Sequence, residues 1–489
     1  MHMSVVKALA EVGHNVTVVS MLKPTITHKN IHHIYVPPTE EQERNLEDMM
    51  SGMAKQKNSI FSIVKKLLSD KNVVIEAQYD LMFDERLQRI YDTKFDLMIQ
   101  GFFLNEFQLG VAAKLKCPVI INWMQAPMAT IDALVGNPYE ISYVPNMNTV
   151  VKPGEGMGFS KRLENLIKQI FGIYIKSLFN KRSNIMYKQI FGNEPNFPSI
   201  EQMRRNISLV FTNSHSISEG PIRPFVPATV EIGGIQVKDK PDPLPKRIQD
   251  FLAKSKHGAI LLSLGSNIKS STVKPEIVKT MFNVLSKLKQ HVIWKWEDLE
   301  NTPGTSSNIL YEKWLPQDDI LAHSKLKLFI THAGKGGITE AQYHGVPMVA
   351  LPIFGDQHTN SEAMQKSGYG LKLELLQLTE DKFRSTLSEV LENDRYANEI
   401  KKFSDLYRDR PLTAKQSVVF WAEYVIRHKG APNIQSPAVH MCWIAYYNLD
   451  VYALIISVLV VGVLLTRLVL KLICRKLSSK CKKSKAKQQ

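Results

Sequence analysis

The second half of the chain alternates short apolar runs with segments of helical periodicity. The apolar runs, which have the length of buried strands, lie at residues 259–264, 291–296, 309–315, 326–331 and 348–351. Apolar residues recur at helical spacing between them, at residues 275–287, 318–322 and 338–344. Strands that alternate with helices predict an α/β fold with a doubly wound parallel sheet. In such a sheet, ligands bind beyond the carboxyl ends of the strands.

The first half shows the same alternation, but less regularly. A helical pattern over residues 1–12 is followed by strand-like runs at residues 15–20, 97–100, 118–122 and 209–212. Two long stretches, 38–92 and 127–205, interrupt this pattern and predict helical insertions that could shape a pocket. The sequence therefore predicts two α/β halves with a cleft between them.

Changes in composition divide the 489 residues into six segments. The Pro-rich, charged run KDKPDPLPKR marks a linker, which we place at 237–250. This linker separates an N-terminal domain, 1–236, from a C-terminal domain, 251–430. The predicted order continues with a juxtamembrane segment at 431–450, a transmembrane helix at 451–470 and a basic tail at 471–489.

The run VYALIISVLVVGVLLTRLVL carries one charge, Arg467. A helix of this length spans about 30 Å, the hydrocarbon thickness of a membrane. Of the formal net charge of +16, nine basic residues and no acidic residue fall between Arg467 and Gln489. This flank favours a single-pass anchor over a buried core helix, with a cytosolic tail and the preceding domains in the lumen. The basic excess is then a membrane feature, and no zinc-finger spacing indicates a nucleic-acid partner.

The two ends of the chain differ in their targeting signals. Lys485 and Lys487 stand fifth and third from the end, as in the dilysine retrieval signal of endoplasmic-reticulum membrane proteins. The alternative is a basic stop-transfer tail. The first 20 residues lack the order of a signal peptide and begin within a helical pattern. We therefore expect that a signal peptide and a first strand precede this sequence.

Residues 326–344 combine an apolar strand, the turn HAGKGG and a helix. Small residues allow the backbone to approach a ligand, and free N–H groups at a helix start attract an anion. His332 and Lys335 add hydrogen-bond donors. The turn therefore predicts a cradle for a phosphate or pyrophosphate, with a tightly packed structural turn as the alternative.

Further polar and aromatic residues follow the ends of neighbouring strands. Glu340 lies about two helical turns beyond the start of the cradle, where its carboxylate could accept from both hydroxyls of a ribose. Trp314 offers an aromatic face and Gln317 an amide, which suit a flat polar base. Asp356 and Gln357 follow the next strand, and this pair of groups suits sugar hydroxyls. The sequence thus predicts binders for a base, a ribose, a pyrophosphate and a sugar at successive strand ends.

The segment 314–357, WLPQDDILAHSKLKLFITHAGKGGITEAQYHGVPMVALPIFGDQ, closely resembles the signature of the UDP-glycosyltransferases, in particular their animal membrane-bound branch. The resemblance covers essentially the whole chain and extends to GHNVTVVS, SLGS, VIWKWE, DRPLT and VIRHKGAP. It implies a GT-B fold, which has two Rossmann-like domains and an interdomain cleft. The N-terminal domain, 1–236, would bind the acceptor and the C-terminal domain, 251–430, the UDP-sugar. The resemblance further implies inverting transfer of a hexosyl group, with UDP-glucose favoured as donor, to the hydroxyl of a small lipophilic acceptor, as in detoxification. No DxD motif is present, so the resemblance implies a UDP-sugar cosubstrate without a bound metal or cofactor.

The resemblance also implies donor-binding residues, position by position. They are Trp314 and Gln317 for the uracil, Glu340 for the ribose, Ser266, His332 and Gly334 for the pyrophosphate, and Asp356 and Gln357 for the donor sugar. Ala333 departs from the family, which usually has Gly there. The sequence leaves open the acceptor, the choice between glucose and glucuronate, and whether the chain forms a homo-oligomer.

The catalytic base is harder to place. The family uses a His that lies about sixteen residues before the position of His14, which here falls before Met1, and His2 does not match that spacing. The family's partner Asp corresponds to Gly101. Glu106 is then the candidate catalytic residue, with an ordinary acid at a helix start as the alternative. If nothing replaces the base, the chain would be a catalytically impaired or inactive membrane protein that binds UDP-sugar.

Overall fold

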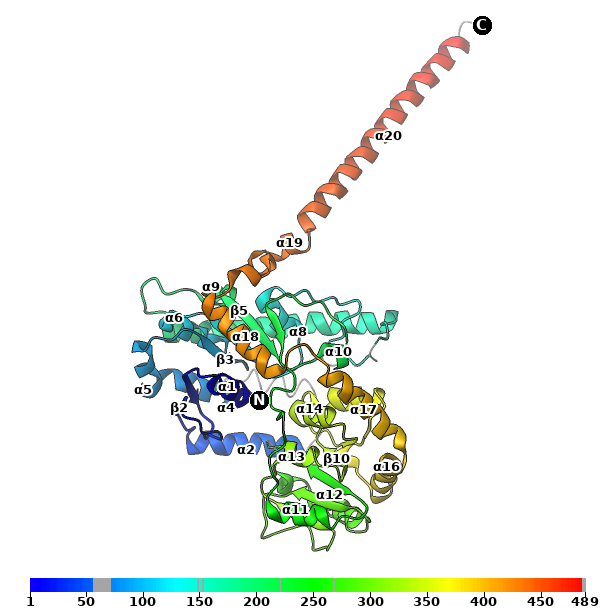
Figure 1. The fold of residues 1–489 in the computed structure, drawn as a ribbon. Coiled ribbons are helices and arrows are strands. Elements are labelled where there is room, and N and C mark those ends of the chain that lie inside the picture. The colour runs from blue at the N-terminus through cyan, green and yellow to red at the C-terminus, as the bar shows by residue number, and fades with distance from the viewer. Residues whose placement is uncertain (56–71, 147–148, 152–153, 220, 267–268, 486–489) are drawn as a thin grey trace. The chain divides into compact units, whose positions relative to one another are not determined.

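The computed structural model describes residues 1–489 except 56–71, 147–148, 152–153, 220, 267–268 and 486–489. The chain divides into two compact units, Met1–Ser436 and Pro437–Gln489. The first unit contains both α/β halves (Figure 1). The boundaries that the sequence predicts inside this unit, at 236 and 251, stay predictions.

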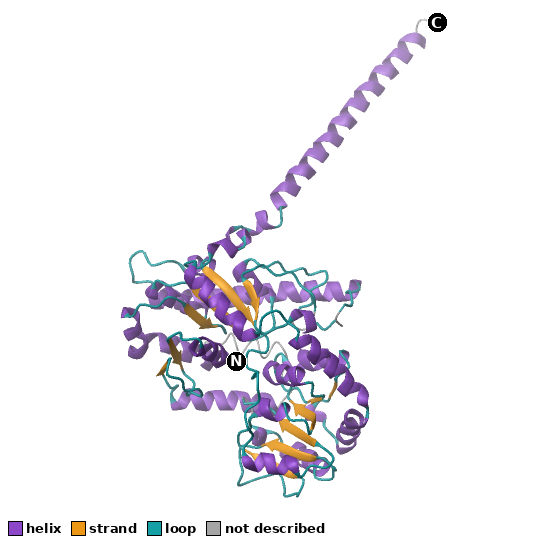
Figure 2. Ribbon diagram, in the orientation of Figure 1, coloured by secondary structure: helices purple, strands orange, loops and turns teal. Residues whose placement is uncertain are grey.

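The C-terminal half contains one continuous parallel sheet, as the sequence predicts, with six strands where the sequence indicated five (Figure 2). The strands are β7 (Ala259–Ser263), β8 (His291–Lys295), β9 (Ile309–Glu312), β10 (Leu326–Thr331), β11 (Met348–Ala350) and β12 (Gly370–Lys372). Their order is β12-β11-β10-β7-β8-β9, so the direction of winding reverses between β7 and β10. The loops that follow these two strands therefore open at the switch point, where doubly wound sheets bind ligands.

Helices cover both faces of this sheet. Successive residues of a strand point to opposite faces, so each strand contributes to the apolar core on either side. Ile260 and Leu262 of β7 belong to one apolar core, while Leu261 belongs to another. The helices of this half are α11 (Lys246–Ala253), α12 (Pro275–Leu285), α13 (Gln317–Leu321), α14 (Lys335–His344), α15 (Gln357–Lys366), α16 (Glu380–Glu392) and α17 (Asp394–Arg408). Helices α12 and α16 contribute to the first core, and α13 and α14 contribute to the second.

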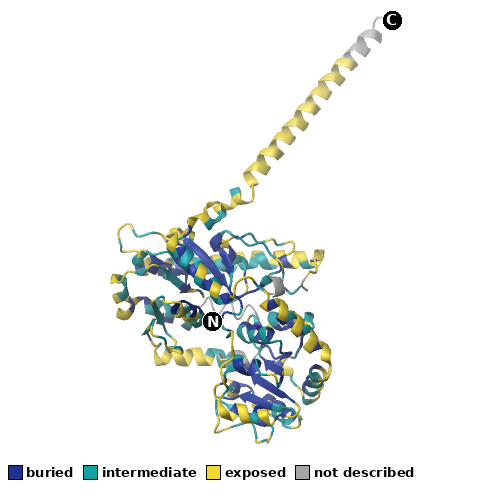
Figure 3. Cartoon of the chain, in the orientation of Figure 1, coloured by how far each residue is buried: buried dark blue, intermediate teal, exposed yellow. Residues whose placement is uncertain are grey.

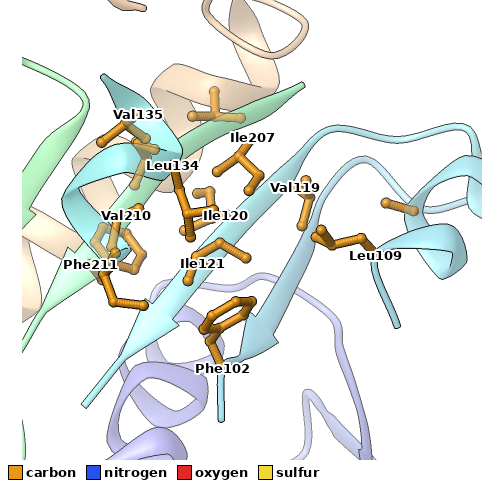
Figure 4. Close-up of a cluster of buried hydrophobic side chains, with 14 of the residues drawn as sticks. Phe102, Leu109, Val119, Ile120, Ile121, Leu134, Val135, Ile207, Val210 and Phe211 are labelled. Atoms are coloured by element: carbon orange, nitrogen blue, oxygen red, sulfur yellow. The ribbon is translucent and has the colours of Figure 1, made fainter. Parts of the chain in front are cut away.

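The N-terminal half has two separate parallel sheets. Strands β3 (Met98–Gly101), β4 (Val119–Trp123), β5 (Ile207–Thr212) and β6 (Thr229–Glu231) form one, and β1 (Val16–Ser20) and β2 (Ile31–Tyr35) form the other. Ile120, Ile121 and Phe211 are fully buried in the core of the larger sheet (Figure 4). Its helices are α1 (His2–Glu11), α2 (Glu40–Lys55), α4 (Val73–Asp80), α5 (Glu85–Gln88), α6 (Gly110–Leu115), α7 (Ala129–Asp132), α8 (Phe159–Phe191), α9 (Ile200–Arg205) and α10 (Ser216–Glu219).

One helix crosses from the second half of the sequence to the core of the first. Helix α18 (Ala414–Arg427) buries Ala414, Val418, Ala422 and Val425 in the core that contains β4 and β5. The last helix of the predicted C-terminal domain therefore completes the N-terminal half. The packing of α18 in the N-terminal core explains why both halves belong to one compact unit.

The second unit contains α19 (Trp443–Tyr446) and α20 (Leu449–Lys485). Among the described residues, one helix is long and apolar enough to cross a membrane, and it lies within α20 at Leu449–Ser478. It extends beyond the predicted span by Leu449 and Asp450 at its start and by residues 471–478, which include basic residues, at its end. Lys487, half of the predicted dilysine signal, lies outside the described residues.

Candidate functional site

The turn after β10 is the centre of the predicted cradle. Strand β10 ends at Thr331 and α14 begins at Lys335, three residues earlier than the sequence predicts. Gly334 is the N-cap of α14, and the preceding Ala333 has φ of +64°. A Cβ disfavours this left-handed conformation, which explains why a glycine would be expected at Ala333. The first N–H groups of α14 lack helical acceptors and so favour an anion.

The ring of His332 packs closely against two glycines. A Cβ at Gly265, which follows β7, would lie 2.6 Å from Cε1 of His332, and a Cβ at Gly334 would clash with Nε2. Burial lowers the pKa of His332 to about 4, and the charge of nearby Lys295 adds to this effect. The imidazole is therefore neutral at physiological pH. Its buried Nδ1 has no hydrogen-bond partner among the described residues.

Two further polar residues lie at the ends of β7 and its neighbour β8. Ser266 is exposed in the loop after β7, so its hydroxyl can meet a ligand. Lys295 at the end of β8 donates from Nζ to Oε1 of Glu297 at 2.5 Å. The sequence singled out Ser266 but not Lys295, whose charge acts on His332.

Gln317 and Glu340 are brought together from two different helices. Nε2 of Gln317, in α13, donates to Oε2 of Glu340, in α14, at 2.6 Å. The helices approach closely here because Gly337 has no side chain: a Cβ there would lie 3.3 Å from Nε2 of Gln317. Burial raises the pKa of Glu340 to about 7, although the bond from Gln317 opposes this shift. The predicted base binder and ribose binder are thus direct neighbours.

Trp314 projects from the loop between β9 and α13. Its side chain is 71% exposed, whereas Trp294 and Trp296 are buried in the core. A large exposed indole near polar groups has an open face for stacking.

Asp356 and Gln357 lie at the start of α15. Oδ2 of Asp356 accepts from Nδ2 of Asn360 at 2.7 Å, and the same amide donates to the carbonyl of Ala333 at 3.0 Å. Burial raises the pKa of Asp356. Oε1 of Gln357 accepts from the backbone N–H groups of Ile353 and Phe354, at 2.8 and 3.1 Å. Asn360, which the sequence gave only a supporting role, therefore links the sugar-binding candidates to the His332 turn.

Lys335 does not stand free at the cradle. Its Nζ donates to Oε1 of Glu219, in α10, at 2.6 Å, and both side chains are buried. The sequence suggested Lys335 as a phosphate ligand, but this pair instead joins the two halves. Nothing in the sequence indicates a pairing across so many residues.

Glu106, the predicted catalytic residue, lies at the start of a short 3₁₀ helix (Glu106–Leu109). Its Oε2 accepts from Nε of Arg204 at 2.9 Å and also from a terminal nitrogen of the same guanidinium. Both side chains are about one-tenth exposed. The carboxylate therefore has a structural partner, and its catalytic role stays a prediction.

His2 occupies a place that spacing alone did not indicate. Its ring lies at the ends of β3 and β4: a Cβ at Gly101 would be 3.2 Å from Cε1 of His2, and Asn122 Nδ2 is 3.1 Å from Nδ1. Burial lowers the pKa of His2 to about 4, and the neighbouring amino terminus adds to this effect. A neutral imidazole thus lies beside Gly101, the position that the resemblance matches to the family's Asp.

The parallel sheets of the two halves and the switch point between β7 and β10 define the class of fold, which is the GT-B fold of glycosyltransferases. Solved GT-B enzymes share this fold, among them a UDP-glucose:anthocyanidin 3-O-glucosyltransferase in complex with UDP. That structure matches 87% of this chain and 95% of its own, with a TM-score of 0.55 and 15% identity. CalG4, the calicheamicin glycosyltransferase, also has a TM-score of 0.55.

The sequence comparison is more specific. The family described as UDP-glucoronosyl and UDP-glucosyl transferase matches residues 1–485, and the chain belongs to this family. UDP-glucosyltransferase 2 of Dactylopius coccus is 34% identical over 93% of this chain and 86% of its own length. UDP-glucuronosyltransferase 1A6 of Mus musculus is 33% identical over 71% of this chain and 63% of its own. The chain is therefore an enzyme that transfers sugar from a UDP-sugar donor.

Proposed function

We propose that this enzyme transfers glucose from UDP-glucose, with inversion, to the hydroxyl of a small lipophilic acceptor. The observation that carries the proposal is His332, held neutral between Gly265 and Gly334 at the N-terminus of α14. A neutral imidazole and the N–H groups at the start of α14 can stabilise the charge that develops on the pyrophosphate as UDP leaves. The name of the Dactylopius coccus relative, UDP-glucosyltransferase 2, supports glucose as the donor sugar.

The other donor contacts follow from the neighbouring groups. Trp314 would stack on the uracil, and Gln317 would bond to its edge. Glu340 lies next to Gln317, as the ribose lies next to the base, so it would accept from the ribose hydroxyls. Asp356 would accept from hydroxyls of the glucose, to which Gln357 would donate from Nε2, since its Oε1 is bonded to the backbone. Ser266 would complete the pyrophosphate site with His332 and Gly334.

In the proposed reaction, the acceptor oxygen bonds to the anomeric carbon while the bond from that carbon to the UDP oxygen breaks. The electron pair of the broken bond stays on the β-phosphate. The acceptor proton passes to a base of the enzyme. Glu106 could accept it at Oε1, because Arg204 binds Oε2.

His2 is a second candidate for this base. Nε2 of a neutral imidazole can take a proton only when Nδ1 carries the hydrogen. Oδ1 of Asn122 is buried and has no partner among the described residues, so turning this amide over would let it accept from Nδ1 of His2. That arrangement would leave Nε2 as the proton acceptor.

The proposed location is the endoplasmic reticulum. The span at Leu449–Ser478 would anchor the chain as a single-pass protein. The basic residues after it support a cytosolic tail, and the catalytic halves would then lie in the lumen. A cleft at a membrane would suit acceptors that partition into lipid.

Product analysis by mass spectrometry tests the proposal. Membranes that contain the full chain receive a lipophilic phenol with either UDP-glucose or UDP-glucuronate. We expect a phenyl glucoside from UDP-glucose and a much smaller yield from UDP-glucuronate. Glu106→Gln and His2→Gln identify the base, because loss of a general base lowers the rate by about 10²–10⁴-fold. Binding of UDP by each variant shows whether the donor half remains intact.

A second candidate function is donor binding without transfer. The pairing of Glu106 with Arg204 and the glycine at position 101 favour it, because Arg204 binds one oxygen of the only candidate carboxylate and Gly101 supplies none. It predicts that the full chain binds UDP-glucose but forms no product with any acceptor. A glucoside formed by the unmodified chain and lost in a base variant would rule it out.

A further inference from the structure

The longest helix of the N-terminal half, α8, carries an apolar stripe on its exposed side. The α8 stripe consists of Phe159, Leu163, Ile167, Ile170, Ile173 and Tyr174, which are between 48% and 75% exposed. These residues recur at the spacing of one helix face and cover about four turns. Figure 3 shows exposed positions along α8, which Figure 1 labels. Isolated exposed apolar residues are ordinary, but a continuous row of this length marks an interaction site.

The opposite side of α8 is fixed to the protein. Nδ2 of Asn165 donates to the carbonyls of Ile141 and Val144, at 2.8 and 2.9 Å. Tyr187 and Phe191 are buried in the core of the N-terminal half. The rotation of the helix about its axis is therefore set, and the α8 stripe cannot turn inward without breaking these contacts.

The charge of α8 favours a lipid surface as the occupant. The helix contains seven Lys and Arg residues and one Glu, Glu164. An amphipathic helix that combines an apolar face with a basic excess is typical of helices that lie in the membrane interface. The same chain carries a candidate membrane span, Leu449–Ser478, which would keep the N-terminal half close to a bilayer at high effective concentration. A second copy of the chain would bring like charges together along this helix.

We infer that the α8 stripe inserts into the interfacial layer of the membrane that α20 anchors, with the basic residues of α8 at the phospholipid headgroups. The contact would hold the acceptor-binding half at the depth where lipophilic molecules partition. It does not depend on the donor site or on the sugar that is transferred.

Fluorescence of the full chain in proteoliposomes tests this inference. The native cysteines, Cys117, Cys442, Cys474 and Cys481, are replaced by serine, and an environment-sensitive NBD label is attached at Ile170→Cys. The matched control is Leu406→Cys, an apolar residue of α17 that is 55% exposed, close to the 59% of Ile170. The liposomes contain phosphatidylcholine and phosphatidylserine, with bromine on the acyl chains in half of the samples.

We expect the label at residue 170 to shift to the blue and to be quenched by the brominated lipids, at a depth of about 5–10 Å. The label at residue 406 should show neither effect. In a second variant, the labelled chain also carries Leu163→Gln and Ile167→Gln, and we expect the quenching to weaken. Equal emission and quenching at residues 170 and 406 would overturn the inference. So would a blue shift at residue 170 that grows with protein density and is insensitive to bromine, because it would indicate a second copy.

Discussion

The candidate functional residues of the two α/β halves are distributed differently along the sequence. In the C-terminal half, the donor-site candidates lie on the loops of one continuous sheet, within the segment 314–357 and the turn after β7. In the N-terminal half, His2, Gly101, Glu106 and Arg204 come from distant parts of the sequence and from elements around two separate sheets. The donor-site candidates thus belong to one local unit of sequence, whereas the candidates for the catalytic base come from remote segments.

The difference extends to electrostatics. His332 is buried with an unpartnered Nδ1, and Glu340 has an amide rather than a cation as its hydrogen-bond partner. Glu106, by contrast, is neutralised by Arg204. Burying a polar or ionisable side chain without a compensating partner lowers stability. Such side chains are common at binding sites, where a ligand supplies the missing partner. This contrast predicts that changes in the donor half affect binding and rate more than stability.

Replacement of His332 should have the largest effect. We expect His332→Ala to lower the rate of sugar transfer by about 10²–10³-fold, the usual effect of removing one donor to a developing negative charge. Steady-state product formation measures this loss. His257→Ala, which changes an exposed histidine of the same half, should leave the rate unaltered. An unchanged rate in His332→Ala would remove His332 from the pyrophosphate site.

Trp314 should contribute mainly to affinity for the base. Trp314→Ala is expected to weaken UDP binding by about 1–3 kcal/mol, the usual value of one stacked base. Because the side chain is exposed, the melting temperature should hardly change. Calorimetric titration with UDP gives the affinity, and Trp314→Phe should recover part of it. Equal UDP affinities for the parent and Trp314→Ala would contradict stacking.

Glu340 should make donor binding depend on pH. Its pKa of about 7 is raised by burial, so the carboxyl becomes protonated as the pH falls below that value. If ribose hydroxyls bind the carboxylate, the affinity for UDP-glucose should fall by up to about tenfold per pH unit below 7. His332, with a pKa of about 4, does not titrate in this range. Titrations between pH 5 and 8 should show this slope, and Glu340→Gln should abolish it; a slope that survives in the variant would point to another group.

Ala333 should show the smallest effect. The left-handed conformation of an alanine destabilises the folded state by about 1–2 kcal/mol. A glycine avoids this strain, but it stabilises the unfolded chain by about 0.4–1 kcal/mol because that chain becomes more flexible. Ala333→Gly should therefore raise the free energy of unfolding by about 1 kcal/mol or less, seen as a small rise in melting temperature. Ala333→Val should lower the melting temperature. The reverse order would mean that the turn is not strained.

The sequence predicts the donor half well because its signals are local. The runs at 259–264 and 326–331 correspond to β7 and β10, and the residues between 314 and 357 gather at the predicted strand ends. The N-terminal half depends on long-range contacts. The pairing of Glu106 with Arg204, the position of His2 beside Gly101 and the return of α18 have no local pattern. Strand β2 was also missed, because IHHIY carries two histidines and lacks an apolar run.

Hydrogen exchange of the full chain with and without UDP tests the central claim most directly, that the C-terminal half alone forms the site for the UDP part of the donor. The account predicts slower exchange in peptides that cover residues 312–320, 330–345 and 352–362. Peptides that cover β3, β4 and Glu106 should exchange at the same rate in both states. Protection by UDP around β3 and β4, with none in residues 330–345, would contradict the account.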